Sequence, residues 1–162
     1  MSSLLREIFT SENADKLALS GHKQVKYSQL EQQVDVAASQ LDQRESHTAK
    51  VIAYESAADF IPYTLASMKT GHMVIPFHSL EGERRLVQIL RATGQSDVLF
   101  TKENLWRNSS EIVGAPLKPL DGLTDEVLSL FTSGSTGLPK GIAFTKEHIE
   151  KCARRLIKFL EI

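Results

Sequence analysis

Residues 128–141 read Leu128-Ser129-Leu130-Phe131-Thr132-Ser133-Gly134-Ser135-Thr136-Gly137-Leu138-Pro139-Lys140-Gly141. The first four residues form a short apolar segment that is typical of a strand, and Ile142-Ala143-Phe144 resumes the apolar pattern directly behind the stretch. Between these segments the chain is rich in glycine and hydroxyl side chains and contains one proline and one lysine. The stretch therefore predicts a loop held between two strands.

The composition of this loop suits the binding of phosphate groups. Glycine lets the backbone turn successive N–H groups toward one ligand, and serine and threonine hydroxyls are adjustable donors. Lys140 adds a mobile positive charge, and Pro139 restricts the backbone just before it. The loop is not a Walker loop, because there the lysine is followed by Ser or Thr and a helix. Here Gly141 and an apolar triplet follow Lys140.

A flexible linker is the alternative interpretation of the same residues, and composition alone favours it. A linker usually separates domains, however, whereas this stretch interrupts two apolar segments that read as strands. The flanking segments therefore favour a loop that belongs to a folded core.

The segment from Phe131 to Gly141 resembles the signature of the adenylate-forming superfamily, which includes acyl-CoA synthetases, peptide-synthetase adenylation domains and luciferases. Two shorter segments are also similar to this family. Residues 27–30 resemble its early Tyr-x-Glu-Leu element, with Gln29 in place of the common glutamate, and residues 68–71 resemble its Leu-Lys-Ala-Gly segment.

The resemblance implies a reaction in which a carboxylate attacks the α-phosphate of ATP and produces an acyl-adenylate and pyrophosphate. It implies Mg²⁺ bound to the triphosphate, and coenzyme A or a carrier protein as a possible final acceptor. The carboxylic acid itself remains open. The residues that the resemblance assigns to the ATP phosphates are Thr132, Ser133, Gly134, Ser135, Thr136, Gly137, Lys140 and Gly141.

The resemblance extends over only the beginning of the family's large amino-terminal domain. The adenine and ribose sites, the acyl pocket, the hinge and the small carboxyl-terminal domain with its catalytic lysine are all expected beyond Ile162. We therefore expect residues 1–162 to be a partial AMP-binding domain that forms no adenylate without the rest of the enzyme or a second chain. A non-catalytic nucleotide-binding or regulatory module is the main alternative. A purely structural partner would leave Lys140 without a role.

Composition sets outer limits on these interpretations. The chain has 162 residues, of which 41% are hydrophobic and 24% charged, as in a soluble globular domain. A net charge of -1 gives no reason to expect a nucleic-acid or membrane surface. The single cysteine, Cys152, excludes an intrachain disulfide, and neither a signal peptide nor a membrane-spanning run is apparent. We therefore expect a cytoplasmic protein.

Strand and helix patterns alternate along the chain, which predicts an α/β fold with a mostly parallel sheet flanked by helices. Ligands of such folds bind outside the carboxyl ends of the strands, where the 132–141 loop is expected. The expected helices are 3–11, 28–41, 57–70, 83–93 and 146–162, and the expected strands are 16–20, 24–27, 50–54, 73–77, 97–101 and 128–131.

Several local patterns add specific expectations. Ser28 and Glu31 form a capping-box pattern, and one helical turn is expected around Trp106 in the otherwise irregular 102–125 segment. Cys152 is expected to pack on the apolar face of the last helix, whereas His72 is expected on the surface. The histidines lack metal-ligand spacing, so no metal site is assigned. An uncovered apolar face or sheet edge would cause association.

Overall fold

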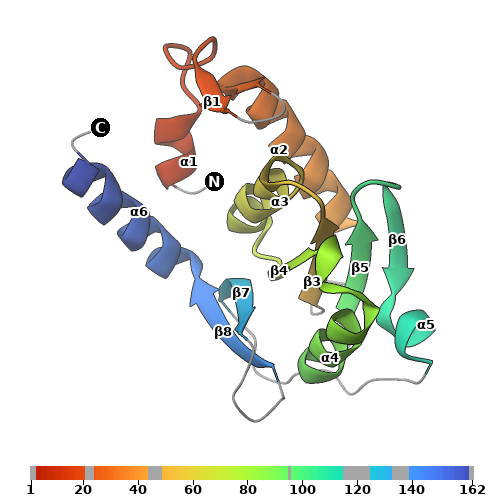
Figure 1. Cartoon of the computed structure of the whole chain (residues 1–162). Coiled ribbons are helices and arrows are strands. Elements are labelled where there is room, and N and C mark those ends of the chain that lie inside the picture. The colour runs from red at the N-terminus through yellow and green to blue at the C-terminus, as the bar shows by residue number, and fades with distance from the viewer. Residues whose placement is uncertain are drawn as a thin grey trace.

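The computed structural model describes residues 3–20, 24–43, 49–94, 96–114, 125–132 and 139–160. Its main feature is a six-stranded sheet in the order β6-β5-β3-β4-β7-β8, with a separate two-stranded sheet formed by β1 and β2. Figure 1 shows β6 and β8 at opposite ends of the main sheet. The strands are β1 (Leu17–Leu19), β2 (Val25–Lys26), β3 (Ala49–Tyr54), β4 (Val74–His78), β5 (Ser96–Phe100), β6 (Leu105–Asn108), β7 (Glu126–Thr132) and β8 (Lys140–Thr145).

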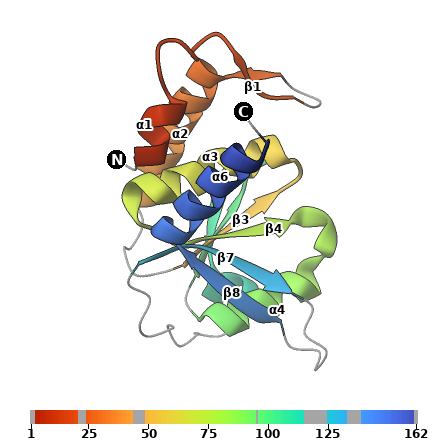
Figure 2. The same ribbon diagram turned by 90° about the vertical axis from the view of Figure 1, so that its left-hand side faces the viewer.

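Helices cover both faces of this sheet. One face carries α1, α2, α3 and α6, while the other carries α4 and α5 (Figure 2). The helices are α1 (Ser3–Ile8), α2 (Tyr27–Asp42), α3 (Ala57–Thr70), α4 (Glu83–Thr93), α5 (Ser109–Val113) and α6 (Lys146–Leu160), with a 3-10 turn, η1 (Ser79–Glu81), after β4. The predicted α/β class is confirmed.

The four inner strands are parallel, and antiparallel strands close both ends of the sheet. β3 pairs in parallel with β4 and β5, and β4 pairs in parallel with β7. β6 runs antiparallel to β5, and β8 runs antiparallel to β7. Because parallel strands point the same way, β3, β4, β5 and β7 all end at one edge of the sheet. Thr132, the first residue of the predicted loop, lies at this carboxyl edge.

The hydrophobic core has two main layers because successive strand residues point to opposite faces. Ile52 and Val74 pack with the buried stripe of α2 and with Ala66 of α3. Val51 and Ile75, their neighbours along the strands, pack instead against α4. The uninterrupted apolar character of β3 and β4 thus reflects burial on both faces.

A buried ion pair lies near the amino ends of β3 and β5. Lys50 is fully buried, and its Nζ is 3.2 Å from Oδ2 of Asp97. The two residues are direct partners in the parallel register of β3 and β5, so the sheet itself brings the opposite charges together. From the sequence alone, Lys50 is predicted only as the first residue of a strand.

The predicted limits of two helices agree with the structure. α3 spans residues 57–70 and α4 spans residues 83–93, as their apolar spacing and following glycines indicated. Gly71 has a φ of 83°, the left-handed conformation that glycine adopts with least strain at a helix end. These boundaries depend on local chemistry and need no tertiary contact to be recognised.

Three local predictions are wrong, each because a nearby contact overrides the local pattern. α2 begins at Tyr27, and the backbone N–H of Lys26 donates to Oε1 of Gln29 at 2.9 Å, so Gln29 serves the helix start in place of Glu31. Trp106 lies in β6, which pairs with β5, and not in a helical turn. His72 is buried, with Nε2 3.2 Å from Oδ1 of Asp42.

α6 and β8 leave apolar surface exposed at one end of the molecule. Ile149 and Ala153 of α6 pack against α1 and α3, and Arg154 forms an ion pair with Glu7 of α1 at 2.7 Å. Cys152, expected to pack, is exposed, and the following turns expose Phe159 to 82%. Within the described ranges no strand pairs with the outer side of β8. Association through this surface stays a prediction.

Candidate functional site

The frame of the predicted loop is a β-hairpin at the carboxyl edge of the sheet. β7 and β8 pair in antiparallel fashion, and Thr132 at the end of β7 is the direct partner of Lys140 at the start of β8. The Thr132 hydroxyl donates to the backbone carbonyl of Lys140 at 3.4 Å. Both ends of the intervening stretch are therefore held against each other by the hairpin.

The structure places three of the eight predicted site residues, namely Thr132, Lys140 and Gly141. All three are exposed, so a ligand in solvent can reach the hydroxyl of Thr132 and the ammonium of Lys140. The remaining five lie outside the described residues: Ser133, Gly134, Ser135, Thr136 and Gly137. The phosphate-binding roles of all eight stay predictions.

Gly141 has a packing role that the sequence analysis did not anticipate. It lies opposite Phe131 in the register of β7 and β8. A Cβ atom at position 141 would be 2.8 Å from Cζ and 3.0 Å from Cε1 of the Phe131 ring. The absence of a side chain at Gly141 thus makes room for the aromatic ring of Phe131 on the paired strand. This packing role is independent of any hydrogen bond from the Gly141 backbone to a ligand.

Replacing Gly141 by Ala is expected to lower the free energy of unfolding by about 1–3 kcal/mol, the usual cost of overpacking. The ring of Phe131 must move to admit the new methyl group, because the distance between this methyl carbon and the ring would be shorter than real Cβ atoms show. Urea denaturation of the single variant and of the double variant Gly141→Ala with Phe131→Leu measures the effect. Equal costs of Gly141→Ala with and without Phe131 would contradict the packing explanation.

Arg85 of α4 is a cation beside the base of the loop that sequence reasoning missed. Its Nη2 donates to the backbone carbonyl of Phe131 at 3.5 Å, and its Nε is 3.7 Å from Oε2 of Glu81. The contact links the start of α4 to the end of β7, 46 residues away along the chain. No local pattern marks Arg85, since only the crossover of the chain brings α4 next to β7.

The described residues contain no group of three or more His, Cys, Asp and Glu side chains that could hold a metal ion. The expectation that no histidine serves as a metal ligand stays a prediction. Among those same ranges, no helix combines the length and hydropathy needed to cross a lipid bilayer.

Comparisons with known proteins gave consistent matches. The chain is 30% identical over 148 residues to the hybrid PKS-NRPS synthetase pydA of Acremonium sp., a match that spans 76% of this chain and 4% of that protein. It is 25% identical to the D-alanine--D-alanyl carrier protein ligase of Staphylococcus haemolyticus, over 83% of this chain and 30% of the ligase. No family model matches the chain.

Among solved structures, the fold is similar to the N-terminal subdomain of NpsA from Klebsiella oxytoca in complex with 3-hydroxyanthranilyl-AMSN. The TM-score is 0.62 at 23% identity, and the match covers 88% of this chain and 39% of that subdomain. In every one of these comparisons the chain spans well under half of the protein it matches. The similarity to NpsA supports the fold alone.

Proposed function

The chain belongs to the adenylate-forming superfamily, and we propose that its residues 132–141 hold the phosphates of ATP while a carboxylate is activated as an acyl-adenylate. The observation that carries this proposal is the hairpin mouth, where Thr132 and Lys140 face each other at the carboxyl edge of the parallel strands. Ligands of open α/β sheets bind at this edge.

Each part of the loop has a distinct task in this proposal. The backbone N–H groups of residues 133–137 and the hydroxyls of Thr132, Ser135 and Thr136 donate hydrogen bonds to the β- and γ-phosphates. Lys140 places a positive charge beside the same phosphates. Its position at the first residue of β8 gives the flexible side chain a fixed base, since β8 is paired along its length with β7.

The reaction in this proposal is a displacement at phosphorus. A carboxylate oxygen forms a bond to the α-phosphorus, the bond from the α-phosphorus to the α,β-bridging oxygen breaks, and pyrophosphate leaves with that oxygen. Negative charge grows on the departing pyrophosphate, and Lys140 offsets it. Mg²⁺ enters bound to ATP as part of the substrate, because a triphosphate needs a divalent cation that bridges its oxygens.

We further propose that residues 1–162 act as a partial amino-terminal domain within a larger assembly. The acyl-adenylate would pass to coenzyme A or a carrier protein, and the similarity to a D-alanine--D-alanyl carrier protein ligase supports a carrier protein. The missing parts would come from the same polypeptide or from a second chain. The exposed apolar side chains of α6 and the open edge of β8 offer a surface for them. The single cysteine favours a cytoplasmic location.

Two measurements on the purified 162-residue chain test the proposal. MgATP and magnesium pyrophosphate should both bind, and each should displace the other in a titration calorimetry experiment, because both present the β- and γ-type phosphates. Exchange of pyrophosphate into ATP with a panel of carboxylic acids should stay at background, since the family resemblance places the acyl pocket outside residues 1–162. Absence of binding by either ligand would overturn the proposal. Carboxylate-dependent exchange by the chain alone would overturn its partial character.

A further inference from the structure

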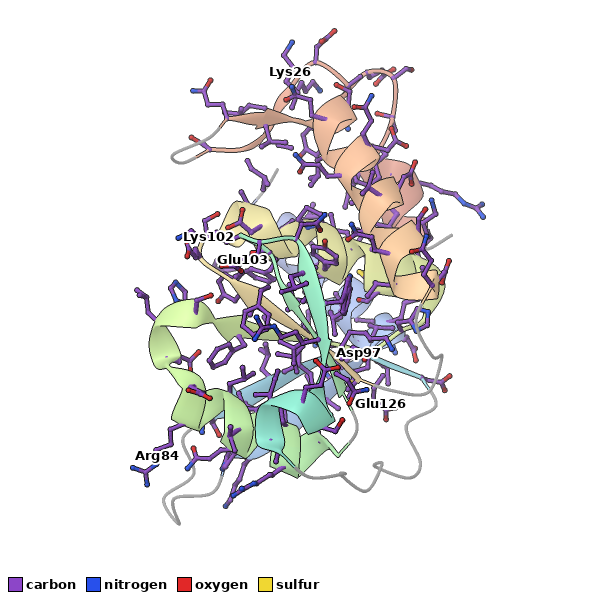
Figure 3. The ribbon with its side chains drawn as sticks, turned by 90° about the vertical axis from the view of Figure 1, so that its right-hand side faces the viewer. Lys26, Arg84, Asp97, Lys102, Glu103 and Glu126 are labelled. Carbon is purple, nitrogen blue, oxygen red and sulfur yellow. The ribbon has the colours of Figure 1, made fainter. Side chains whose placement is uncertain are left out.

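A cavity of about 580 Å³ opens at the carboxyl edge of the sheet, beyond the ends of β3, β4 and β5. The start of α4, the segment after β5, and α5 complete its walls. Lys102 and Glu103 lie at the same end of the sheet, far from Asp97 near the opposite end of β5 (Figure 3). The volume falls within the range of small-molecule sites. Thr132, Lys140 and Gly141, the predicted site residues that the structure describes, do not line this cavity.

The floor of the cavity is apolar and belongs to the buried core. Ala53, Phe77 and Leu86 are each at most 3% exposed and are packed into the layer between the sheet and α4. Phe100 and Ile112 are partly buried and extend this surface toward α5. A floor made of packed core side chains is rigid, so it suits the body of an apolar or aromatic molecule.

The rim of the cavity carries an excess of negative charge. Four carboxylates line it, from Glu55, Glu83, Glu103 and Glu111, against the two cations of Lys102 and Arg107. Both cations already have partners. Lys102 Nζ is 3.1 Å from Oε1 of Glu55, and the Arg107 guanidinium lies over the Phe100 ring at 5.4 Å.

The carboxylates of Glu55 and Glu103 consequently stabilise the charged form of Lys102. The hydrogen bond from Lys102 to Glu55 raises the pKa of the lysine, and the charges of Glu55 and Glu103 act in the same direction. An anionic ligand would have to compete with these carboxylates for Lys102. A polyphosphate is therefore a poor ligand for this cavity.

Of the four rim carboxylates, Glu55 forms an ion pair with Lys102, and the charge of Glu103 also acts on Lys102. Within the part of the chain that the structure describes, neither Glu83 nor Glu111 forms an ion pair. Each lies in the first turn of its helix, Glu83 in α4 and Glu111 in α5. These two carboxylates of the rim thus remain available for a ligand.

We propose that this cavity binds a small molecule with an apolar or aromatic body and a protonated amine, with the body on the floor of Phe77, Leu86 and Phe100 and the amine between Glu83 and Glu111. The proposal does not depend on ATP binding at the 132–141 loop. The ligand proposed for this cavity is positively charged, whereas the phosphates proposed for the loop are negatively charged.

The test uses two probes that share a ring and a chain length but differ in charge. Phenethylamine and 3-phenylpropionate are titrated into the 162-residue chain at low salt and neutral pH, with binding followed by chemical-shift changes in ¹⁵N-labelled protein. The amine is expected to bind about tenfold more tightly than the carboxylate, with shifts at residues of the floor and rim. Equal affinities, or no amine binding at millimolar concentration, would overturn the proposal.

Substitutions of the rim carboxylates test whether Glu83 and Glu111 cause the preference for the amine. The double substitution Glu83→Gln and Glu111→Gln keeps the size of both side chains and is expected to weaken amine binding about fivefold while leaving 3-phenylpropionate binding unchanged or stronger. Glu31→Gln removes one charge from the exposed face of α2, away from the cavity, and should change neither affinity. A thermal melt checks that each variant is folded. Equal weakening by Glu31→Gln would reduce the effect to net charge and overturn the proposed site.

Discussion

Replacing Lys140 by Ala is expected to weaken the binding of MgATP and of magnesium pyrophosphate to the chain about 10–100-fold, the usual value of a charge-assisted contact to phosphate. Lys140 is exposed at the mouth of the β7–β8 hairpin, so its removal leaves the packing of the core unchanged. Titration calorimetry at low and moderate salt measures the effect. In a whole enzyme, carboxylate-dependent exchange of pyrophosphate into ATP should fall by at least the same factor.

Lys146→Ala is the matched control for this experiment. Lys146 begins α6 at the far end of β8, so the substitution removes the same charge from the same end of the chain without altering the hairpin mouth. Lys140→Arg keeps the charge and should retain most of the affinity. Equal losses for Lys140→Ala and Lys146→Ala would mean that the effect is general electrostatics and that Lys140 does not contact the phosphates.

Removing the charge of Asp97 is expected to lower the free energy of unfolding by about 3 kcal/mol or more, because it takes away a carboxylate that pairs with the ammonium of a fully buried lysine. This is a large part of the 5–15 kcal/mol that stabilises a typical domain. Urea denaturation of Asp97→Ala, followed by circular dichroism, measures it. The double variant Lys50→Met with Asp97→Ala should recover much of the loss, since an apolar side chain at position 50 needs no ionic partner.

An exposed ion pair provides the comparison. Asp35 of α2 and Lys69 of α3 are 2.6 Å apart, but both side chains are accessible to water. Asp35→Ala should therefore cost no more than about 1 kcal/mol. If Asp97→Ala cost no more than Asp35→Ala, burial of the Lys50 pair would not contribute to the stability of the sheet.

These two experiments address separate properties of the molecule. The substitution of Lys140 tests ligand binding at the carboxyl edge of the sheet, whereas the substitution of Asp97 tests the stability of the amino ends of β3 and β5. A chain that loses MgATP binding on Lys140→Ala but keeps its unfolding free energy has a site at the hairpin. A loss of both on that substitution would indicate that Lys140 supports the fold.

The sequence alone determined the α/β class, the limits of α3 and α4, and the position of the loop between two strands. These features depend on neighbours along the chain. Apolar residues at helical spacing define the buried face of a helix, and Gly71 ends α3 because it adopts a positive φ with little strain. The same holds for the family resemblance, which rests on eleven consecutive residues from Phe131 to Gly141.

The tertiary structure alone decided which distant residues meet. Trp106 joins a strand because β5 offers it an unpaired edge, and Gln29 caps a helix that begins one residue earlier than its Ser28 pattern indicates. Lys50 meets Asp97, and Gly141 accommodates Phe131, only through the register between strands. A pairing register depends on the packing of both strands against shared helices, and no local pattern in either strand specifies it.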